Sequence, residues 1–352
     1  MNHHPLIRRL VGPVLRLALG ALVLTAGALQ PAAATETRTL CIYDPIGANG
    51  FIYQSFQDYI VQARAWGIRL KPKAYTDEAV AANDFKAGKC DMAAITGVRD
   101  IHFVKFAGSL DMAGGLQTYA QEKTAIRVMS SPKAAKYMQQ GDYEVAGVVP
   151  LGKAFLFARN RSDLDSLKKL AGKKIAVLSD DKQASTLANV AGASPVGASI
   201  ASFGPMFNNH SVDLAYAPSF AYDALELYKG LGNNGGIADF VLGMLSGQLV
   251  FHKNRFPADF GQKSRTWVFN NMYGPTMRRV KQSDNKIPDK YWVHISGDRA
   301  RKYRQMFRKT RERLWKEGWY SHKMQHMLKK IRCSSDPSLA ECSLDSEGGP
   351  VN

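Results

Sequence analysis

The fold follows from the stretch RTLCIYDPIGANG at residues 38–50 and from the pattern that continues after it. Its first half is an apolar run typical of a buried strand, and its second half is a glycine-rich turn. Apolar residues at helical spacing come next, until Gly67 ends that segment. This alternation at short spacing predicts a parallel sheet with helices on its faces. The expected elements are a strand at 38–43, a helix at 51–66, a strand at 68–75, a helix capped by Thr76 that runs to Lys89, and a strand at 90–96.

The same pattern restarts after residue 144 and gives a second α/β unit. Residues 241–252 then lead back toward the first unit, and the remainder is mostly helical, most clearly at 259–277 and 298–318. Two α/β units joined by a return crossing predict a hinged molecule with a cleft between two lobes. The expected elements of the second unit are strands at 144–150, at 154–158, at 174–178, from 195 onward and at 212–216, with helices at 162–171, 183–191 and 203–209.

Residues 1–34 read as a cleavable export signal. Three arginines precede an apolar run at 17–29, and three alanines at 32–34 close the segment, which is the order of a secretory signal. The apolar run is short for a bilayer span, although an uncleaved anchor is the alternative. Cleavage would leave a mature chain of 318 residues, enough for two domains, in the periplasm of a Gram-negative cell.

The mature chain keeps four cysteines, and an even number in an oxidising compartment indicates two disulfides. Three pairings are possible. Cys41 and Cys90 each open a predicted strand, whereas Cys333 and Cys342 are nine residues apart in a polar tail that closes readily into a small loop. We therefore favour Cys41–Cys90 and Cys333–Cys342. A four-cysteine metal site would show tight C-x-x-C pairs, which the sequence lacks.

The positive charge is concentrated near the C-terminus. The whole sequence carries a net charge of +17, and thirteen Lys or Arg residues stand between 298 and 333 against three acids. A solvated helix face is the simpler interpretation. The alternative is a docking surface for an anionic membrane or an acidic partner. Nucleic acid is not expected as a partner, because no recognition motif accompanies the charge.

Several segments resemble known exported binding proteins. Residues 81–97, AANDFKAGKCDMAAITG, are similar to a segment of extracytoplasmic solute receptors, and residues 163–222 resemble the second lobe of the DctP-type periplasmic binding subunit of TRAP transporters. A closer resemblance, over nearly the whole mature chain, is to a family of exported solute-binding proteins, some of whose members are described as efflux-pump-related. It rests on CIYDPIGANG (41–50), ITGVRD (95–100), the segment 131–157, ELYKGLG (226–232) and the terminal pair of cysteines.

The resemblance implies an α/β fold, that of a two-lobed, type II-like periplasmic binding protein with a helical C-terminal region. Its expected parts follow the pattern of the chain. They are a first lobe at 35–144, a second lobe at 145–245, a return crossing and helical region at 246–332 that packs on the first lobe, and a disulfide-closed, flexible tail at 333–352.

One departure from the TRAP receptors bears on the ligand. In those receptors, the strand after the L-x-G-x-K-I segment carries an arginine that grips a substrate carboxylate with two parallel hydrogen bonds. The matching position here is Ala176, which argues against an organic acid as the ligand. Lys153, Arg99, Arg159 or Lys182 could substitute, but a lysine ammonium is a point charge rather than a planar fork.

A ligand is expected at the carboxyl ends of the strands, where loops and helix N-termini meet. The loop that begins at Asp44 allows close approach of its backbone, with an ordinary turn as the alternative. Arg99 is a candidate contact or the partner in a surface salt bridge, and Asp180 is more simply a helix cap. Aromatic and small residues dominate the candidate set, which suits a partly apolar ligand. The candidates are Asp44, Pro45, Gly47, Asn49, Thr96, Gly97, Arg99, Pro150, Gly152, Ser179, Lys182, Tyr216, Pro218 and Tyr222.

The sequence carries no recognisable catalytic constellation, so we expect no enzyme activity, no cofactor and no metal. The G-x-S-x-G elbow, the H-E-x-x-H helix and the P-loop are absent from it. His322 and His326 stand four apart on an expected helix, but neither a carboxylate nor a third ligand accompanies them.

These observations predict a periplasmic solute-binding protein that closes about a hinge on a small molecule. By resemblance, it would deliver that molecule to the membrane subunits of a TRAP-type or related transporter. The rival interpretation is a non-catalytic envelope adaptor that kept the fold without a ligand and docks on a membrane efflux complex through its basic C-terminal helix. A third interpretation is a scaffold for a lipid or another hydrophobe, because the candidate cleft has few charges.

Overall fold

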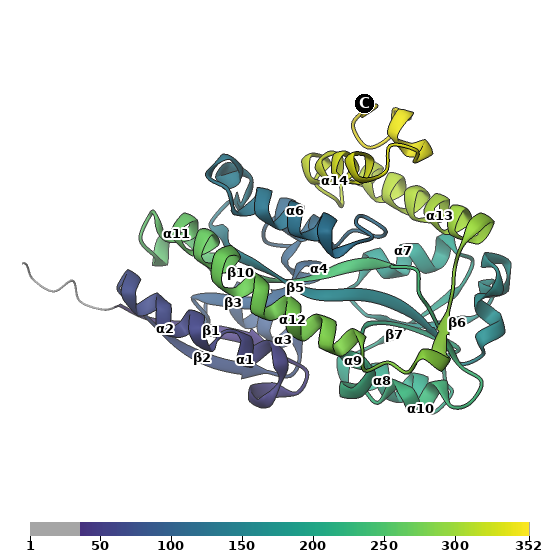
Figure 1. The fold of residues 1–352 in the computed structure, drawn as a ribbon. Helices are drawn as coiled ribbons and strands as arrows, with labels where there is room; N and C mark the ends of the chain where they lie inside the picture. The colour runs from purple at the N-terminus through teal and green to yellow at the C-terminus, as the bar shows by residue number, and fades with distance from the viewer. Residues whose placement is uncertain (1–35, 352) are drawn as a thin grey trace, which may run out of the picture. The chain divides into compact units, whose positions relative to one another are not determined.

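The computed structural model describes residues 36–351, and the expected export signal lies outside them. The described strands form one mixed sheet of eleven strands (Figure 1). Across the sheet the order is β2 (Ile68–Tyr75), β1 (Glu36–Tyr43), β3 (Met92–Thr96), β10 (Gly243–His252), β5 (Tyr143–Ala158), β8 (Leu214–Pro218), β6 (Lys174–Leu178) and β7 (Ser194–Ala198). The short strands β4 (Gln139–Gln140) and β9 (Gly236–Ala238) pair with β5, and β11 (Trp292–Val293) pairs with β9.

The sheet has two parallel ends and an antiparallel centre. β1 pairs in parallel with β2 and β3, and β6 pairs in parallel with β7 and β8. The long strands β5 and β10 run antiparallel to each other between these ends, and each also pairs with one of the ends. We call the β2-β1-β3 end the first lobe and the β8-β6-β7 end the second lobe. The predicted α/β class and return crossing are confirmed.

Strand β5 differs from the prediction of two separate strands at 144–150 and 154–158. It is continuous, and a register shift against β10 at Leu245/Ser246 takes up one extra residue near Pro150. Proline has no N–H for a sheet ladder, but a bulge interrupts the ladder and therefore tolerates it. The sequence-based prediction therefore placed a break between two strands where the structure has a bulge in one.

Side chains of the first lobe alternate between two cores. Along β1, Cys41 and Tyr43 point into one hydrophobic cluster, and Leu40 and Ile42 point into another on the opposite face. Both faces of the sheet are therefore buried, as expected for parallel strands with helices on each side. The helices of this part of the chain are α1 (Phe51–Ser55), α2 (Gln57–Ala63), α3 (Glu78–Lys86), α4 (Gly97–Asp100), α5 (Lys105–Gly108) and α6 (Tyr119–Ser130).

Helix α3 begins one residue later than predicted, because its N-cap is Asp77 and not Thr76. The Asp77 carboxylate accepts the backbone N–H groups of Ala79 and Val80, at 2.8 and 3.2 Å. Aspartate satisfies two free amides of the first turn and also bears the negative charge that a helix N-terminus favours.

In the second lobe, the predicted helix at 162–171 is wrong. Two 3₁₀ turns, Arg161–Asp165 and Leu167–Leu170, replace it, because Ser166 between them is extended, at φ −159°. The helices of this lobe are α7 (Lys182–Val190), α8 (Ile200–Asn208), α9 (Ala221–Ala224) and α10 (Leu227–Leu231).

The C-terminal helices pack on both lobes, so the expectation that the whole region packs on the first lobe is wrong for α13. α13 buries Tyr303, Met306 and Phe307 in the same cluster as Val177 of β6 and Leu214 of β8. α14 contacts α6 of the first lobe, and Figure 1 shows both helices along the same side of the sheet. The helices are α11 (Phe260–Trp267), a π-helical stretch at Val268–Met272, α12 (Tyr273–Asp284), α13 (Gly297–Lys316) and α14 (His322–Ser335). Among the described residues, no helix combines the length and the apolar character that crossing a membrane requires.

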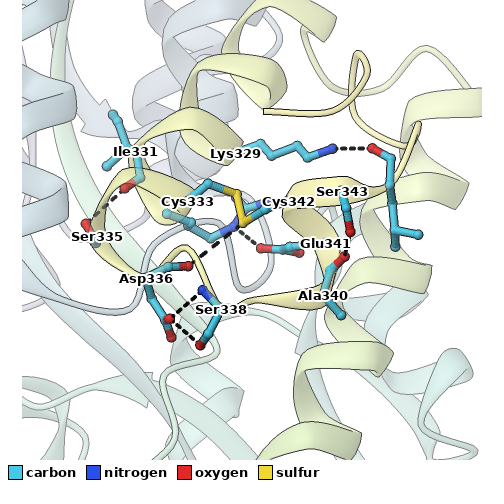
Figure 2. The surroundings of a disulfide bond; sticks show 12 residues. Lys329, Ile331, Cys333, Ser335, Asp336, Ser338, Ala340, Glu341, Cys342 and Ser343 are labelled. Carbon is cyan, nitrogen blue, oxygen red and sulfur yellow. Dashed lines mark hydrogen bonds and ion pairs between the residues drawn. A yellow bond between two sulfur atoms is a disulfide. The ribbon is translucent and has the colours of Figure 1, made fainter. Parts of the chain in front are cut away.

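Both favoured disulfides are confirmed, Cys41–Cys90 in the first lobe and Cys333–Cys342 in the tail. Figure 2 shows the second one joining the end of α14 to the turn that carries Glu341.

The tail holds buried charges that tie it to the helices, which argues against the flexibility expected of it. The Glu347 side chain is fully buried and pairs with Arg311 of α13 and Arg332 of α14. Burial alone would raise the pKa of Glu347, but the two arginines outweigh it and lower that pKa to about 2. Lys329 donates to three tail carbonyls, at 2.6 to 2.8 Å.

Candidate functional site

A cavity of about 120 Å³ lies between the two lobes, at the carboxyl ends of β1, β3, β6 and β8. Parallel strands expose their loops and helix N-termini at this edge, so side chains from both lobes meet there. We call this cavity the polar compartment, because three acids and an arginine line it. It is lined by Tyr43, Pro45, Ile52, Glu78, Thr96, Val98, Arg99, Ala154, Leu178, Asp180, Asp181, Ile200, Phe203, Tyr216, Ala217, Pro218, Phe220, Ala221, Leu225 and Leu245.

Arg99 reaches from the first lobe to the second. It lies on α4, directly after β3, and its Nη1 donates to Oδ2 of Asp180 over 2.9 Å. The Arg99 side chain is 16% exposed, whereas that of Asp180 is 60% exposed. The ion pair therefore spans the rim of the polar compartment, where water reaches the carboxylate.

Glu78 lines the polar compartment from the first turn of α3 and is 8% exposed. Its Oε1 accepts the backbone N–H of Thr96 over 2.5 Å. The side chain of Thr96 also interacts with this carboxyl group and lowers its pKa. Burial raises the pKa of Glu78, against the lowering effects of Arg99 and of the Thr96 N–H. A buried carboxyl therefore borders the cavity.

Asp181 faces Glu78 from the second lobe's side of the compartment and caps α7. Its Oδ1 accepts the N–H of Ala184, and its Oδ2 accepts the hydroxyl of Tyr216, both at 2.8 Å. Burial raises the pKa of Asp181 and of Tyr216. The predicted cap at Asp180 is wrong, because Asp181 immediately precedes the helix while Asp180 pairs with Arg99.

A second cavity, of about 90 Å³, lies among α7, α13 and the sheet of the second lobe. We call it the apolar compartment. It shares Val98, Ala154, Asp181, Tyr216 and Leu245 with the polar compartment, so the two cavities adjoin. Its other lining residues are almost all apolar, and they include Leu156, Leu170, Ile175, Leu187, Leu214, Leu242, Met244 and Met306.

Part of the predicted site is brought together in the polar compartment. Of the candidate residues, Pro45, Thr96, Arg99, Tyr216 and Pro218 line it. They come from three segments far apart in the sequence, and the fold collects them because each lies near the carboxyl end of a strand or just after it. Their contact with a ligand stays a prediction.

The Asp44 loop is held by its own hydrogen bonds. The Asp44 carboxylate accepts the N–H groups of Ile46, Ile52 and Tyr53 at 2.7 to 3.0 Å, so it caps the first turn of α1. Gly47 has φ +77°, a conformation that glycine adopts without strain, and Asn49 ends the same short turn. Neither glycine nor asparagine lines the polar compartment, and Asp44 borders a separate cavity of about 170 Å³.

Gly97, Pro150 and Gly152 serve the packing of the backbone. A Cβ added at Gly97 would come within 2.6 Å of the Asp111 carboxyl group. Pro150 lies opposite Ser246 at the β5 bulge, and Gly152 has φ +111° just beyond it. The three positions therefore shape the strands around the cavity without lining it.

Ser179, Lys182 and Tyr222 also lie outside the lining of the polar compartment. Ser179 donates its hydroxyl to a backbone carbonyl of β7. Lys182 pairs with Glu317 over 2.7 Å, and Tyr222 packs against two other tyrosines in the second lobe.

Ala176 is fully buried in β6. The guanidinium that the TRAP receptors place at the matching strand position therefore has no counterpart there. Of the proposed substitutes, Arg99 lines the polar compartment, whereas Lys153, Arg159 and Lys182 do not.

The buried acids of the first lobe were not predicted from the sequence. Asp100 and Glu122 are fully buried, and none of their carboxyl oxygens has a partner among the described residues. Asp111 accepts the N–H and the hydroxyl of Ser246, and burial raises its pKa to about 8. Glu78 was missed as well, because an acid in the first turn of a helix is common for its effect on the helix dipole alone. Within residues 36–351, no group of three or more His, Cys, Asp and Glu side chains is arranged to hold a metal ion.

The sequence of residues 64–347 matches the family described as Solute-binding protein AdeT 1/2. A similar protein is Probable solute-binding protein AdeT1 of Acinetobacter baumannii. It is 42% identical over 306 residues, which cover 87% of this chain and 100% of that protein.

Two solved structures have a similar fold. One is a TRAP periplasmic solute-binding protein from Desulfovibrio salexigens with bound orotic acid, at a TM-score of 0.67 and 13% identity, covering 84% of this chain and 97% of that one. The other is a TRAP periplasmic solute-binding protein from Ralstonia eutropha H16 with bound (S)-2-acetolactate, at a TM-score of 0.64 and 15% identity, covering 84% and 98%. The predicted two-lobed fold is confirmed.

Proposed function

Because this chain belongs to the AdeT 1/2 family of solute-binding proteins, we propose that it captures a small molecule in the polar compartment by closing its two lobes. The observation that carries this proposal is the cavity itself, which lies between the lobes and takes its lining from both. A ligand that touches both lobes binds the closed form better than the open one, and therefore shifts the equilibrium toward closure.

The hinge of this motion is the pair of strands that crosses between the lobes. β5 and β10 pair with each other along the crossing, and both register shifts of the sheet lie in that pair. Bulges weaken the ladder locally and let a strand bend. Gly152, at φ +111°, stands at one of them and tolerates a backbone angle that other residues rarely adopt.

The wider role follows from the family and from the export signal expected at residues 1–34. A binding protein without catalytic activity, working in the periplasm, would pass its solute to the subunits of a membrane transporter, of TRAP type or related. Thr96, Arg99 and Tyr216 are the polar ligand contacts that we propose, with Pro45 and Pro218 as apolar ones, because all five line the compartment.

The first test is native mass spectrometry of the protein purified gently from the periplasm, with denaturation to release any passenger. We expect a stoichiometric small molecule that raises the melting temperature when it is added back. Small-angle X-ray scattering should record a smaller radius of gyration with that molecule bound.

A filled cavity should abolish the effect. Val98 lines both compartments, so Val98→Trp should remove the melting-temperature shift and the change in radius. Val80→Trp, at a side chain 49% exposed on α3, is the matched control and should respond like the native protein. A solute that still stabilises Val98→Trp would place its site elsewhere.

An empty protein that no metabolite library stabilises would favour the adaptor. One observation already weakens that rival, because Arg311, Lys329 and Arg332 of the basic segment are buried and bound to the tail. Their charges hold the fold together and are not offered to a partner.

A further inference from the structure

The polar compartment carries more acid than base. Glu78, Asp180 and Asp181 line it against one cation, Arg99. Arg99 is already paired, because its Nη1 donates to Asp180. The two buried carboxyls, Glu78 and Asp181, form no ion pair of their own among the described residues, although the charge of Arg99 lowers the pKa of both.

These two carboxyl groups differ in the hydrogen bonds that they accept. Both oxygens of Asp181 accept hydrogen bonds, from the α7 backbone and from Tyr216. Glu78 is more than nine-tenths buried, and its Oε1 accepts the Thr96 N–H, but it forms no ion pair with a cation among the described residues. Burying a carboxylate without a counter-charge is costly, and a cation beside it removes that cost.

The same arrangement repels an anion. A carboxylate ligand in this compartment would approach two buried acids and would compete with Asp180 for the single guanidinium. Ala176, at the position that matches the arginine of the TRAP receptors, is buried in the strand and supplies no charge. The charge distribution therefore differs from one that would hold an organic acid.

The rest of the lining suits an apolar cation. Tyr43, Phe203, Tyr216 and Phe220 contribute aromatic rings to the polar compartment, and a ring face attracts a cation. The apolar compartment adjoins this set at Val98, Asp181 and Tyr216. A chain attached to a group held near Asp181 can thus enter a cavity walled mostly by aliphatic side chains, with Asp111 and Gln183 as its other polar residues.

From this juxtaposition we propose that the solute is a small organic cation with an apolar substituent. Its ammonium group lies between Glu78 and Asp181, and its apolar part occupies the apolar compartment. The inference rests on the proposed solute-binding function and names the class of solute for that site.

The test uses three probes of equal chain length and different charge, hexylammonium, hexanoate and 1-hexanol, titrated calorimetrically into the protein after removal of any passenger. We expect hexylammonium to bind at least tenfold more tightly than hexanoate, with 1-hexanol between them. Ethylammonium should bind more weakly than hexylammonium, because it leaves the apolar compartment empty.

The decisive variant is Glu78→Gln, which keeps the shape of the side chain and removes its charge. It should weaken hexylammonium at least tenfold and leave 1-hexanol within about twofold. Retained binding of 1-hexanol also shows that the variant is folded. Asp165→Asn, at an acid 52% exposed on the second lobe, is the control and should change neither affinity.

The outcomes separate this inference from the proposed function. Hexanoate binding as tightly as hexylammonium, or an anionic or neutral passenger in native mass spectrometry, would overturn the cation and leave solute binding intact. Equal affinity of native protein and Glu78→Gln for hexylammonium would also overturn it. If none of the probes binds and no passenger is found, the proposed function fails together with the inference.

Discussion

At the scale of single residues, the buried acids of the first lobe determine how stability depends on pH. Burial raises the pKa of Asp111 to about 8 and raises that of Asp100 well above its ordinary value of 3.8. In both cases the folded protein holds a proton that the unfolded chain releases. The resulting stability is fully present below about pH 4 and is lost as the pH rises through the folded pKa, with each factor of ten in proton affinity worth about 1.4 kcal/mol.

We predict that Asp111→Asn flattens the fall of unfolding free energy between about pH 4 and pH 8. Asparagine cannot ionise, so the proton uptake on folding that Asp111 causes disappears. Urea denaturation at a series of pH values measures the slope. Ser246→Ala is the directional control, because the Ser246 hydroxyl lowers the pKa of Asp111 and its loss should extend the slope to higher pH. Parallel curves for Asp111→Asn and the native protein would contradict the prediction.

At the scale of elements, the tail after α14 is held by one disulfide and a cluster of buried ion pairs. Arg311 of α13 and Arg332 of α14 each form ion pairs with Glu341 and Glu347, so both helices bind the same two tail residues. The Cys333–Cys342 disulfide closes a loop of nine residues around Glu341, as Figure 2 shows. Removing either buried partner would leave an unpaired charge in the interior, which is strongly destabilising.

We predict that replacing both tail cysteines with serine lowers the unfolding free energy by about 2–3 kcal/mol, the chain-entropy value for a loop of this length. Hydrogen exchange should increase across residues 336–351, because Glu341 is then held by its ion pairs alone. The matched control replaces Cys41 and Cys90 with serine. Their loop of 49 residues is longer, so the cost should be about 4 kcal/mol, without faster exchange in the tail. Unchanged exchange at 336–351 in the tail variant would show that the ion pairs suffice.

At the scale of the whole molecule, the Arg99–Asp180 pair connects the lobes on the rim of the cavity. Asp180 is open to water, so the pair contributes at most about 1 kcal/mol to closure, and salt screens it. A contribution of that size shifts the ratio of open to closed molecules by about fivefold at most.

We predict that Asp180→Asn raises the radius of gyration of the ligand-free protein toward that of the open form. High salt should raise it in the native protein and leave the variant unchanged, because the variant has no pair to screen. Small-angle scattering at low and high salt measures both effects. Asp165→Asn, whose carboxylate pairs with Lys169 inside the second lobe, should behave as the native protein does. Equal radii for all three proteins at every salt concentration would rule out a role for the pair in closure.

How far the sequence predicted the structure depends on whether the deciding contacts are local. Strands β2 and β6 have the predicted bounds, and the paired cysteines are the ones favoured, because hydrophobic runs and short loops are visible in the chain. The candidate ligand positions were placed by a rule about strand ends, and that rule correctly brings Thr96, Arg99 and Tyr216 to one cavity. It could not tell these residues from Tyr222, which belongs to the same segment of chain as Tyr216 and faces a core.

What the sequence alone determined is the α/β class, the return crossing, the disulfide pairs and the edge of the sheet at which a cavity forms. Each follows from periodicity, spacing and the direction of parallel strands. The tertiary structure alone decided the chemistry of that cavity. Glu78 and Asp181 are more than one hundred residues apart and each looks like an ordinary residue of a helix start. They border one compartment because the lobes bring the N-termini of α3 and α7 together. The burial of both carboxyl groups in that compartment cannot be predicted from a local sequence pattern.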